Sequence, residues 1–400
     1  MRIGMMVDVY KPYVSGITNY ITLSKRYLEK LGHEVFVFTF GDLDYQDDEN
    51  NILRSPGLPL VDTGLYVSFR YSLSAQRLLH TMDVVHVHHP FLSGILALRY
   101  CASRGIPIVF TNHTRYDLYS QAYLPSVLDG VSETFLKAYI PTFCRSINMV
   151  VAPSPGMRSV LEQLGVDVPI EVVPNGVDLT LFHKQIEPVD RQQYGFKPND
   201  VVLIYVGRLG PEKNIPFLLR AFNGLAQTYN HVGLMIVGDG PERGNLEDRV
   251  HHMKLETRVH FTGMIPFETV ARYLTMADAF VTASVTEVHP LTMLEAMAAG
   301  LPVTGIVSPG IGDTIENGVT GYLADTEDLA LFTAKLVRMA TDHDCRRQMG
   351  QKAKEVVEYY SIERTTTQVL EHYQKLTRQF ARRRHSLQAR WLRFFDRFFL

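Results

Sequence analysis

Short runs of β-branched and other apolar residues alternate, along the first half of the chain, with longer segments that mix apolar and polar residues. The runs predict strands, and the mixed segments are long enough for helices. The predicted strands are Ile3–Val7, Glu34–Phe40, Val84–Val87, Ile108–Thr111, Met149–Ala152 and Glu171–Val173, and the predicted helices include Asn19–Leu31, Leu92–Arg104 and Met157–Leu164. Such alternation is typical of a parallel sheet that carries helices on both faces.

The alternation restarts after a polar segment, Phe182–Asp200, which contains two prolines and is predicted to connect two domains. The predicted strands of the second half are Val201–Val206, Leu234–Val237, Val259–Phe261, Ala279–Thr282 and Pro302–Ile306. We therefore predict an α/β protein with two Rossmann-like, doubly wound domains, residues 1–181 and 182–360. Ligands of such sheets bind beyond the carboxyl ends of the strands, so two facing edges predict an interdomain cleft.

The composition allows two buried cores and argues against nucleic acid as a general partner. The chain has 400 residues, 46% of them hydrophobic, and a formal net charge of -2, which predicts no general affinity for nucleic acid. Three scattered cysteines are typical of a reducing cytoplasm rather than of a disulfide framework. The first residues predict a strand rather than a signal peptide, and no apolar run approaches the ~18 residues of a membrane-spanning helix. These features favour a cytoplasmic protein.

Charge is unevenly distributed along the chain. The segment Arg378–Leu400 holds seven Arg and one Asp, whereas Asp42–Asn51 is acidic and is expected to form a solvated loop. Large apolar residues recur at helical spacing within residues 377–400, which predicts a basic amphipathic tail on an anionic membrane surface. The membrane-facing residues would be Arg382, Arg383, Arg390, Trp391, Arg393, Phe394, Phe395 and Phe398. A helix packed on the protein body and a disordered tail are the alternatives.

Two cations follow the first predicted strand of the second half. Arg208 and Lys213 lie in the segment Gly207–Asn214, between that strand and a helix. Cations are unfavourable at a helix N-terminus unless an anion joins them, so this placement favours phosphate binding over two ordinary surface cations. Arginine can bind two phosphate oxygens at once, and lysine adds a point charge.

Two carboxylates lie eight positions apart after the strand Ala279–Thr282. Glu287 ends this β-rich stretch, and Glu295 lies in the predicted helix Leu291–Ala299, beside its buried stripe. Carboxylates suit sugar and ribose hydroxyls, and paired cations suit a diphosphate, so the four charged residues together predict a site for a nucleotide sugar. A solvent-exposed position is the alternative for Glu295.

The first half adds candidates that also follow strands. Gly16 opens a helix, where a ligand could approach the backbone, although an ordinary turn capped by Thr18 or Asn19 explains the segment equally well. His113 follows one strand, and His86, His88 and His89 cluster after another. We expect His113 to contact substrate because of its placement. We expect no metal, because no cysteine or spaced carboxylate joins the histidines.

Together these motifs resemble the family 4 glycosyltransferases, which have the GT-B fold, over residues 1–375. The matching segments are the Gly16 loop, His113, Asn175-Gly176-Val177-Asp178, Gly207-Arg208-Leu209, Glu212-Lys213-Asn214, Phe261-Thr262-Gly263, the Glu287 to Glu295 signature, Gly310-Ile311-Gly312 and Asn317-Gly318-Val319-Thr320-Gly321. Within the family, the chain looks most similar to diacylglycerol glucosyltransferases. Pro290 departs from the pattern, since glycine is usual there and proline has no N–H to offer a phosphate.

The resemblance implies retaining transfer of a hexose from a nucleotide sugar, with no metal or other cofactor. Its implied donor-site residues are Arg208 and Lys213 for the diphosphate, Glu287 and His113 for the hexose, Glu295 for the ribose, Gly16, Leu291 and Thr292 for backbone approach to the phosphates, and Gly263 and Met264 for the base. The family's last helix packs on the first domain, a role that we assign to residues 361–376.

The predicted function is transfer of glucose from UDP-glucose to a lipid acceptor such as diacylglycerol, at the inner face of the cell membrane. Tyr116, Tyr119 and Tyr123 would shape an acceptor channel or, equally, pack within a helix. The alternatives are a soluble sugar acceptor, a GDP-mannose donor, a nucleotide-sugar epimerase and a non-catalytic nucleotide-sugar binder. The order of the cations and carboxylates fits a transferase better than an epimerase.

Overall fold

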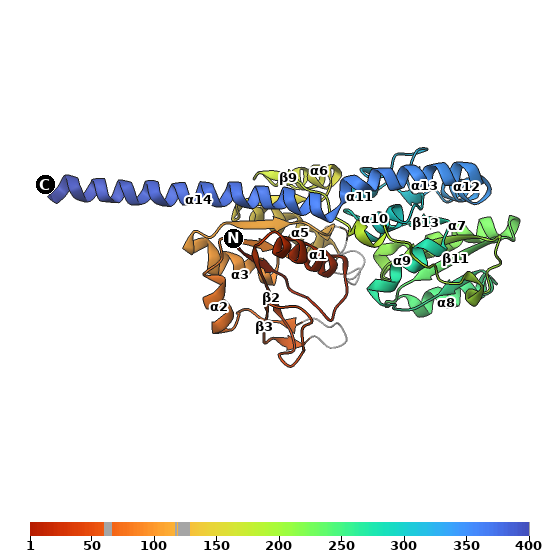
Figure 1. The fold of residues 1–400 in the computed structure, drawn as a ribbon, viewed down its shortest axis with the longest axis horizontal. Coiled ribbons are helices and arrows are strands. Elements are labelled where there is room, and N and C mark those ends of the chain that lie inside the picture. The colour runs from red at the N-terminus through yellow and green to blue at the C-terminus, as the bar shows by residue number, and fades with distance from the viewer. Residues whose placement is uncertain (60–65, 117, 119–128, 400) are drawn as a thin grey trace.

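Two domains, each built on a parallel β-sheet, lie side by side along the long axis of the molecule (Figure 1). The computed structural model describes residues 1–59, 66–116, 118 and 129–399, and the side chains of all of these except 129–135 and 383–399. Tyr119 and Tyr123 therefore lie outside the described residues. The predicted α/β fold with two doubly wound sheets is confirmed.

The first domain contains a seven-stranded sheet in the order β3-β2-β1-β6-β7-β8-β9, with every neighbouring pair parallel. Its strands are β1 (Arg2–Met6), β2 (Glu34–Phe40), β3 (Ile52–Ser55), β6 (Val84–Val87), β7 (Ile108–Thr111), β8 (Met149–Ala152) and β9 (Ile170–Val172). Its helices are α1 (Gly16–Lys30), α2 (Leu73–Leu79), α3 (Leu92–Cys101), α5 (Asp129–Arg145) and α6 (Pro155–Gln163). A separate small hairpin joins β4 (Leu58–Pro59) to β5 (Tyr66–Val67).

The second domain contains a six-stranded parallel sheet in the order β12-β11-β10-β13-β14-β15. Its strands are β10 (Val201–Val206), β11 (Val232–Val237), β12 (Val259–Phe261), β13 (Ala279–Val281), β14 (Val303–Ile306) and β15 (Gly321–Ala324). Its helices are α7 (Ile215–Thr228), α8 (Arg243–His252), α9 (Phe267–Met276), α10 (Leu291–Ala298), α11 (Pro309–Gly312), α12 (Leu329–Thr341) and α13 (His343–Val357). The edge strands β3 and β15 were not among the predicted strands.

Each sheet has a point where its strand order reverses, between β1 and β6 in the first domain and between β10 and β13 in the second. In doubly wound sheets this switch point is where ligands bind, at the carboxyl ends of the strands. The loops that leave these ends carry Gly16, His113, Arg208, Lys213 and Glu287. The fold therefore gathers the predicted site residues of each domain at one edge of its sheet.

The segment between the domains is packed rather than loose. Phe182 and Phe196 are buried, and the Phe196 ring lies so close to Gly233 that a Cβ there would meet it at 2.2 Å. Arg191 adds a hydrogen bond to the Asp200 carbonyl at 2.9 Å. The predicted connection is present, but Phe196 anchors it to the second domain.

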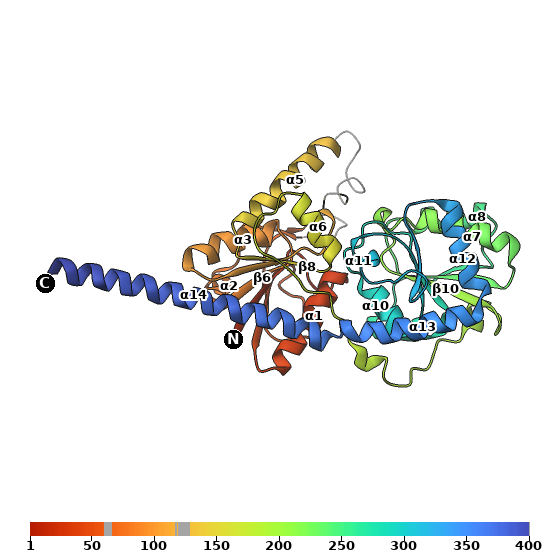
Figure 2. The ribbon, with the colours of Figure 1, turned by 90° about the horizontal axis from the view of Figure 1, so that it is seen from above.

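The last helix, α14 (Ile362–Phe399), runs from the second domain across the first and then beyond it (Figures 1 and 2). Val369, Leu370, Tyr373 and Leu376 are buried where it crosses, and it packs against α1. The predicted packing helix, 361–376, and the predicted tail, 377–400, thus belong to one continuous helix through residue 399. None of the helices in the described part of the chain is both long and apolar enough to cross a membrane.

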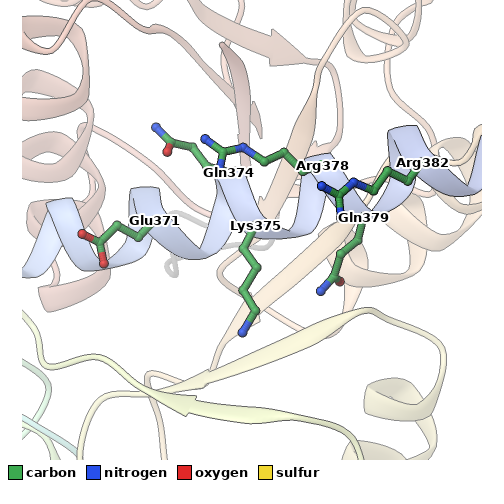
Figure 3. Close-up of a pocket in the computed structure, with 6 residues that line it drawn as sticks. All are labelled: Glu371, Gln374, Lys375, Arg378, Gln379 and Arg382. Carbon is green, nitrogen blue, oxygen red and sulfur yellow. The ribbon is translucent and has the colours of Figure 1, made fainter.

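A shallow groove of about 400 Å³ follows α14 where the helix leaves the body (Figure 3). Six polar residues line it, half of them basic: Glu371, Gln374, Lys375, Arg378, Gln379 and Arg382. Three cations and one carboxylate face this groove. The cationic character of the tail therefore begins on the part of α14 that contacts the first domain.

Candidate active site

The loop after β10 carries the two candidate cations. Arg208 is exposed, and its carbonyl accepts a hydrogen bond from the buried Tyr205 hydroxyl at 3.1 Å. Lys213 ends the short helix Pro211–Lys213, and Asn214 follows with a left-handed backbone, at φ 52°. Asparagine tolerates this conformation better than most residues, which explains its place before α7.

Hydrogen bonds join this loop to the loop after β13. The Asn214 side-chain amide donates to the Ala283 carbonyl at 3.3 Å. The hydroxyls of Ser284 and Thr286 donate to the Glu212 carbonyl at 3.3 and 3.4 Å. Because β10 and β13 are neighbouring parallel strands, both loops leave the sheet at the same edge. Contacts within the protein thus hold the two loops together.

An ion pair brings one predicted cation and one predicted carboxylate into contact. The Lys213 ammonium lies 2.8 Å from Glu287, and the two side chains are 23% and 14% exposed. Burial, together with the nearby charges of Glu287 and Glu212, raises the pKa of Tyr205 well above its usual value. Its hydroxyl therefore keeps its proton and remains a donor to the Arg208 carbonyl.

Glu295 is far more buried than a surface carboxylate. It is 6% exposed, and burial raises the pKa of its carboxyl to about 8. The solvent-exposed alternative for this residue is therefore wrong. Glu295 lies on α10, which begins after Pro290 without a side-chain cap. The amides of Leu291 and Thr292 occupy the first turn, where unsatisfied N–H groups favour an anion.

Close packing requires two glycines beside these loops. A Cβ on Gly238 would lie 2.0 Å from the Gly207 carbonyl oxygen, and one on Gly310 would lie 2.3 Å from the Val288 carbonyl. The Gly310 N–H also donates to the Glu287 carbonyl at 3.0 Å. Gly310 therefore helps to fix the backbone that carries the Glu287 carboxylate.

The segment predicted to line the base follows β12. Gly263 has φ 70°, and its carbonyl accepts a hydrogen bond from the Gly238 N–H at 3.1 Å. Met264 is 66% exposed, unusually high for a large apolar side chain. The exposed thioether offers a flexible apolar surface for a flat ring.

Asn175 and His289 join the two domains, although neither residue was singled out for this role from sequence. The Asn175 N–H donates to His289 Nδ1 at 3.2 Å, and its side-chain amide donates to the His289 carbonyl at 2.8 Å. Burial lowers the pKa of His289 to about 3, so the ring is neutral and Nδ1 can accept. The Gly156 N–H adds a second junction by donating to the Asp313 carboxylate at 2.6 Å.

The loop that leads to Gly16 needs no glycine for packing. The Ser15 hydroxyl accepts a hydrogen bond from the Thr18 N–H at 3.2 Å and so caps α1. A Cβ on Gly16 would meet no atom within 4 Å. The turn is therefore capped, but by Ser15 rather than by the predicted Thr18 or Asn19, and the open space at Gly16 leaves room for another molecule to approach the helix.

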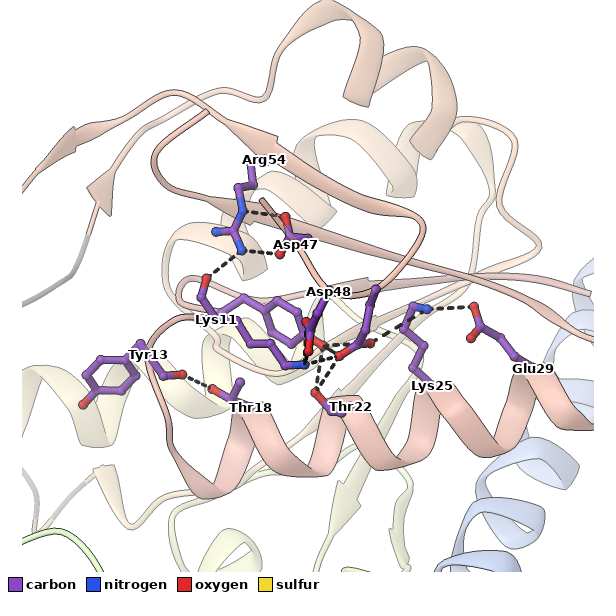
Figure 4. A network of polar contacts seen from close by, with 11 residues as sticks. Lys11, Tyr13, Thr18, Thr22, Lys25, Glu29, Asp47, Asp48 and Arg54 are labelled. Atoms are coloured by element: carbon purple, nitrogen blue, oxygen red, sulfur yellow. Dashed lines mark hydrogen bonds and ion pairs between the residues drawn. The ribbon is translucent and has the colours of Figure 1, made fainter. Parts of the chain in front are cut away.

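A polar network holds the same loop against the acidic segment 42–51 (Figure 4). Lys11 forms ion pairs with Asp48 at 2.9 Å and with Glu49, and Arg54 pairs with Asp47 at 2.6 Å. The Asp47 and Glu49 side chains are only 14% and 18% exposed. The expectation of a solvated acidic loop is therefore wrong for these two residues, because buried cations compensate their charge.

The histidines form hydrogen bonds with one another and with neighbouring hydroxyls. His88 Nδ1 lies 3.0 Å from His113 Nε2. His86 bonds to the Thr111 hydroxyl at 2.6 Å and to the Tyr373 hydroxyl on α14. Burial lowers the pKa of His86, His88 and His113, so the rings are neutral at pH 7. The sequence predicted the cluster but not its link to α14.

The predicted acceptor and membrane residues are described only in part. The Tyr116 ring packs edge-on against Phe91, at 5.3 Å between centroids, as a packing aromatic would. Of the predicted membrane-facing side chains, that of Arg382 is described and lines the groove on α14. The side chains of Arg383, Arg390, Trp391, Arg393, Phe394, Phe395 and Phe398 lie outside the described part.

Comparison with known sequences identifies both halves of the chain. Residues 14–181 match the family described as Glycosyltransferase Family 4, and residues 187–356 match the family described as Glycosyl transferases group 1. The alpha-monoglucosyldiacylglycerol synthase of Streptococcus pneumoniae is 31% identical, over 81% of this chain and 75% of its own. The synthase of the same name from Acholeplasma laidlawii is 29% identical, over 80% and 84%. A GDP-mannose-dependent alpha-mannosyltransferase of Corynebacterium glutamicum is 27% identical, over 93% and 88%.

Solved structures show the same fold at low sequence identity. Sucrose-phosphate synthase from Thermosynechococcus elongatus superposes with a TM-score of 0.77 at 20% identity, covering 94% of this chain and 99% of that one. Anabaena HepE in complex with UDP-glucose gives 0.70 at 19% identity, covering 94% and 100%. The match of both halves, the 31% identity and the two parallel-sheet domains together show that the chain is a glycosyltransferase of the GT-B fold and belongs to family 4.

Proposed function

We propose that this glycosyltransferase moves glucose from UDP-glucose to a lipid acceptor such as diacylglycerol, with retention of configuration and without a metal. The observation that carries the proposal is the contact between Lys213 and Glu287, which puts the cation that we assign to the phosphates beside the carboxylate that we assign to the sugar. Two relatives named as monoglucosyldiacylglycerol synthases support glucose and a diacylglycerol acceptor. The enzyme would act on the inner face of the cell membrane, with α14 against the lipid.

The proposed donor position follows from the two linked loops. The diphosphate lies against Arg208, Lys213 and the first turn of α10, where Leu291 and Thr292 offer backbone amides. Glu287 and His113 contact the hexose, and Glu295 accepts from the ribose hydroxyls. Gly16 admits the phosphates from the first domain, and Gly263 and Met264 line the base.

This arrangement suits a reaction in which charge separates. The bond between the sugar and the diphosphate breaks, the acceptor oxygen bonds to the same face of the sugar, and the acceptor proton passes to the departing phosphate oxygen. Fixed cations stabilise the negative charge that develops on the leaving group, an effect of a few kcal/mol in preorganised sites. Attack on the same face requires no nucleophile from the protein.

The donor and the acceptor can be tested together by incubating the full chain with radiolabelled UDP-glucose and a membrane lipid extract. We expect label in the lipid phase and free UDP. A converted nucleotide sugar without labelled lipid would instead identify an epimerase, and no reaction at all would leave a binding protein. Parallel reactions with GDP-mannose and with soluble sugars test the alternative donor and acceptor, the former motivated by the mannosyltransferase relative.

Activity is expected to survive removal of divalent metal. The Arg208 and Lys213 cations would supply the charge that a metal supplies in metal-dependent transferases. Enzyme treated with EDTA and assayed in metal-free buffer should keep most of its rate. A loss of activity that manganese restores would contradict the metal-independent mechanism.

Nucleoside binding is expected to tighten as pH rises from 6 to 8. Burial raises the pKa of Glu295 to about 8, so below that pH the free protein mostly holds the neutral acid, whereas ribose hydroxyls donate best to the carboxylate. If only the ionised form binds well, affinity rises by roughly fiftyfold over this range, because the ionised fraction grows from about 1% to about half. Calorimetry with uridine, which carries no phosphate, measures the change.

Glu295→Gln is the matched control because it keeps the shape and removes the titration. Its affinity for uridine should not vary over the same pH range.

The raised pKa of Glu295 also means that folding favours the protonated form, so the carboxyl lowers stability as pH rises from the usual value of 4.5 towards 8. Glu295→Gln should therefore raise Tm relative to the wild type more at pH 8 than at pH 5. An equal pH dependence in both proteins would rule out Glu295 as the titrating group.

A further inference from the structure

Neighbouring aromatic rings fix the Nε2 side of the His113 ring and leave its Nδ1 side open. Its Nε2 lies 3.0 Å from His88 Nδ1, and the Tyr20 ring packs edge-on against it at 4.9 Å between centroids. His88 in turn packs against His86, whose ring is 4.2 Å away and is fixed by two hydrogen bonds. Among the described residues, His113 Nδ1 makes no hydrogen bond, so this nitrogen is the one available to a ligand.

One proton must lie between His88 and His113. Burial lowers the pKa of both rings, so both are neutral and each carries a single N–H. At 3.0 Å, one of the two facing nitrogens donates and the other accepts. The tautomer of His88 therefore determines which nitrogen of His113 carries the proton.

The second nitrogen of His88 decides between the two arrangements. His88 Nε2 is buried and has no hydrogen-bond partner among the described residues. A proton on Nε2 would leave a buried N–H donor unsatisfied, which folded proteins rarely tolerate, whereas a bare acceptor nitrogen is tolerated more often. The arrangement with the proton on His88 Nδ1 is therefore favoured, with His113 Nε2 accepting it.

We propose that His88 is a positioning residue that holds His113 in the tautomer with its proton on Nδ1, so that His113 presents an N–H donor to an oxygen of the nucleotide sugar. The consequence for catalysis rests on the proposed function, in which His113 contacts the hexose. A fixed donor suits a phosphate or sugar oxygen whose negative charge grows during transfer. The opposite tautomer would present a lone pair to that oxygen and repel it.

The tautomer can be measured without any activity. Long-range ¹H–¹⁵N correlation spectra of the full chain labelled in histidine distinguish nitrogens that carry a proton from those that do not, and the His113 signals are assigned by their loss in His113→Gln. We expect a single His113 tautomer, protonated on Nδ1. A His113 protonated on Nε2 would overturn the proposal, whatever the enzyme's activity.

Two substitutions test the role of His88 in transfer. His88→Leu removes the donor, while His88→Asn places an amide near the position of Nδ1 and can still donate to His113 Nε2. We expect His88→Leu to mix the His113 tautomers and lower kcat by about tenfold to a hundredfold, with KM for UDP-glucose changed less than about threefold. His88→Asn should restore the single tautomer and most of kcat.

A histidine outside the site provides the matched control. His260 Nε2 is likewise buried without a partner, but its ring packs against Phe196 in the second domain. His260→Leu should leave the His113 tautomer and kcat unchanged. If His88→Leu also leaves both unchanged, the positioning role is wrong. If the wild type shows the expected tautomer but transfers no glucose, the proposed function fails and the tautomer assignment stands.

Discussion

Lys213→Ala is expected to lower kcat by about a hundredfold or more, and Arg208→Ala by a similar factor. Both cations lie on a loop that Asn214, Ser284 and Thr286 hold in place, so they would meet the departing diphosphate without reorganisation. An interaction made mainly in the transition state changes kcat more than KM. Steady-state kinetics with UDP-glucose measure both constants.

The ion pair with Glu287 complicates the Lys213 result and also offers a control. Lys213→Ala leaves the Glu287 carboxylate, 14% exposed, without its partner at 2.8 Å, and that alone could distort the loop. If loop distortion is the whole effect, the double variant Lys213→Ala/Glu287→Gln should recover activity. We expect the double variant to stay as impaired as the single ones, because Glu287→Gln removes a contact to the hexose.

An exposed lysine of the same domain serves as the matched control. Lys197 lies on the connecting segment, away from both loops, and Lys197→Ala should behave as the wild type. Thermal unfolding of every variant verifies that the fold survives. Near-normal kinetics for Arg208→Ala, Lys213→Ala or Glu287→Gln would mean that the active site lies elsewhere.

A chain that ends at Arg382 is expected to lose its binding to anionic liposomes while remaining folded. The structure sets this end point, because Leu376 is buried and Phe380 still packs against the core, whereas the later helix extends beyond the body. The truncation removes five arginines and the aromatic residues between them. Each basic residue near an anionic surface contributes about 1 kcal/mol, so sedimentation with the liposomes should be abolished.

Two further variants distinguish the effect of positive charge on the tail from that of positive charge elsewhere on the surface. The full chain with Arg390, Arg393 and Arg397 replaced by glutamine should bind weakly, and the wild type should release at high salt. A control that replaces the exposed Arg347 and Lys354 on α13 by glutamine should sediment as the wild type does. If the truncated and full chains sediment equally, α14 has no role at the membrane and the lipid-acceptor proposal loses its support from the tail.

The strand pattern determined the fold because buried parallel strands are continuous apolar runs. Runs such as Val201–Val206 were predicted to the residue, since both faces of that strand are buried and every position must be apolar. β3 was missed because it contains Arg54 and three of its four positions are only partly buried. β15 was missed because it begins at a glycine, which is depleted in strands, although all four of its positions are buried. The edge position of β3, which relaxes the need for apolar residues, is a tertiary property.

The helix at the C-terminus, α14, shows that a change in composition does not by itself mark the end of a helix. Residues 361–376 and 377–400 differ in charge, which suggested two elements, yet the whole segment contains no glycine or proline to end a helix. That signal was available in the sequence and predicts the single helix α14. The direction in which the helix leaves the body depends on its packing against α1 and could not be read from the pattern.

Charged residues after successive strands predicted the region of the candidate active site, because parallel strands end at one edge of a sheet. Which side chains meet there depended on the pairing of β10 with β13, which brings Lys213 to Glu287 across 74 positions. The depth of burial that raises the pKa of Glu295 depended on the packing around α10. The contact between His88 and His113 arose in the same way, from neighbouring strands β6 and β7. Residue type and order therefore predict which chemistry the candidate site could perform, whereas distances, protonation and partners required the tertiary structure, because they depend on strand neighbours that local sequence does not specify.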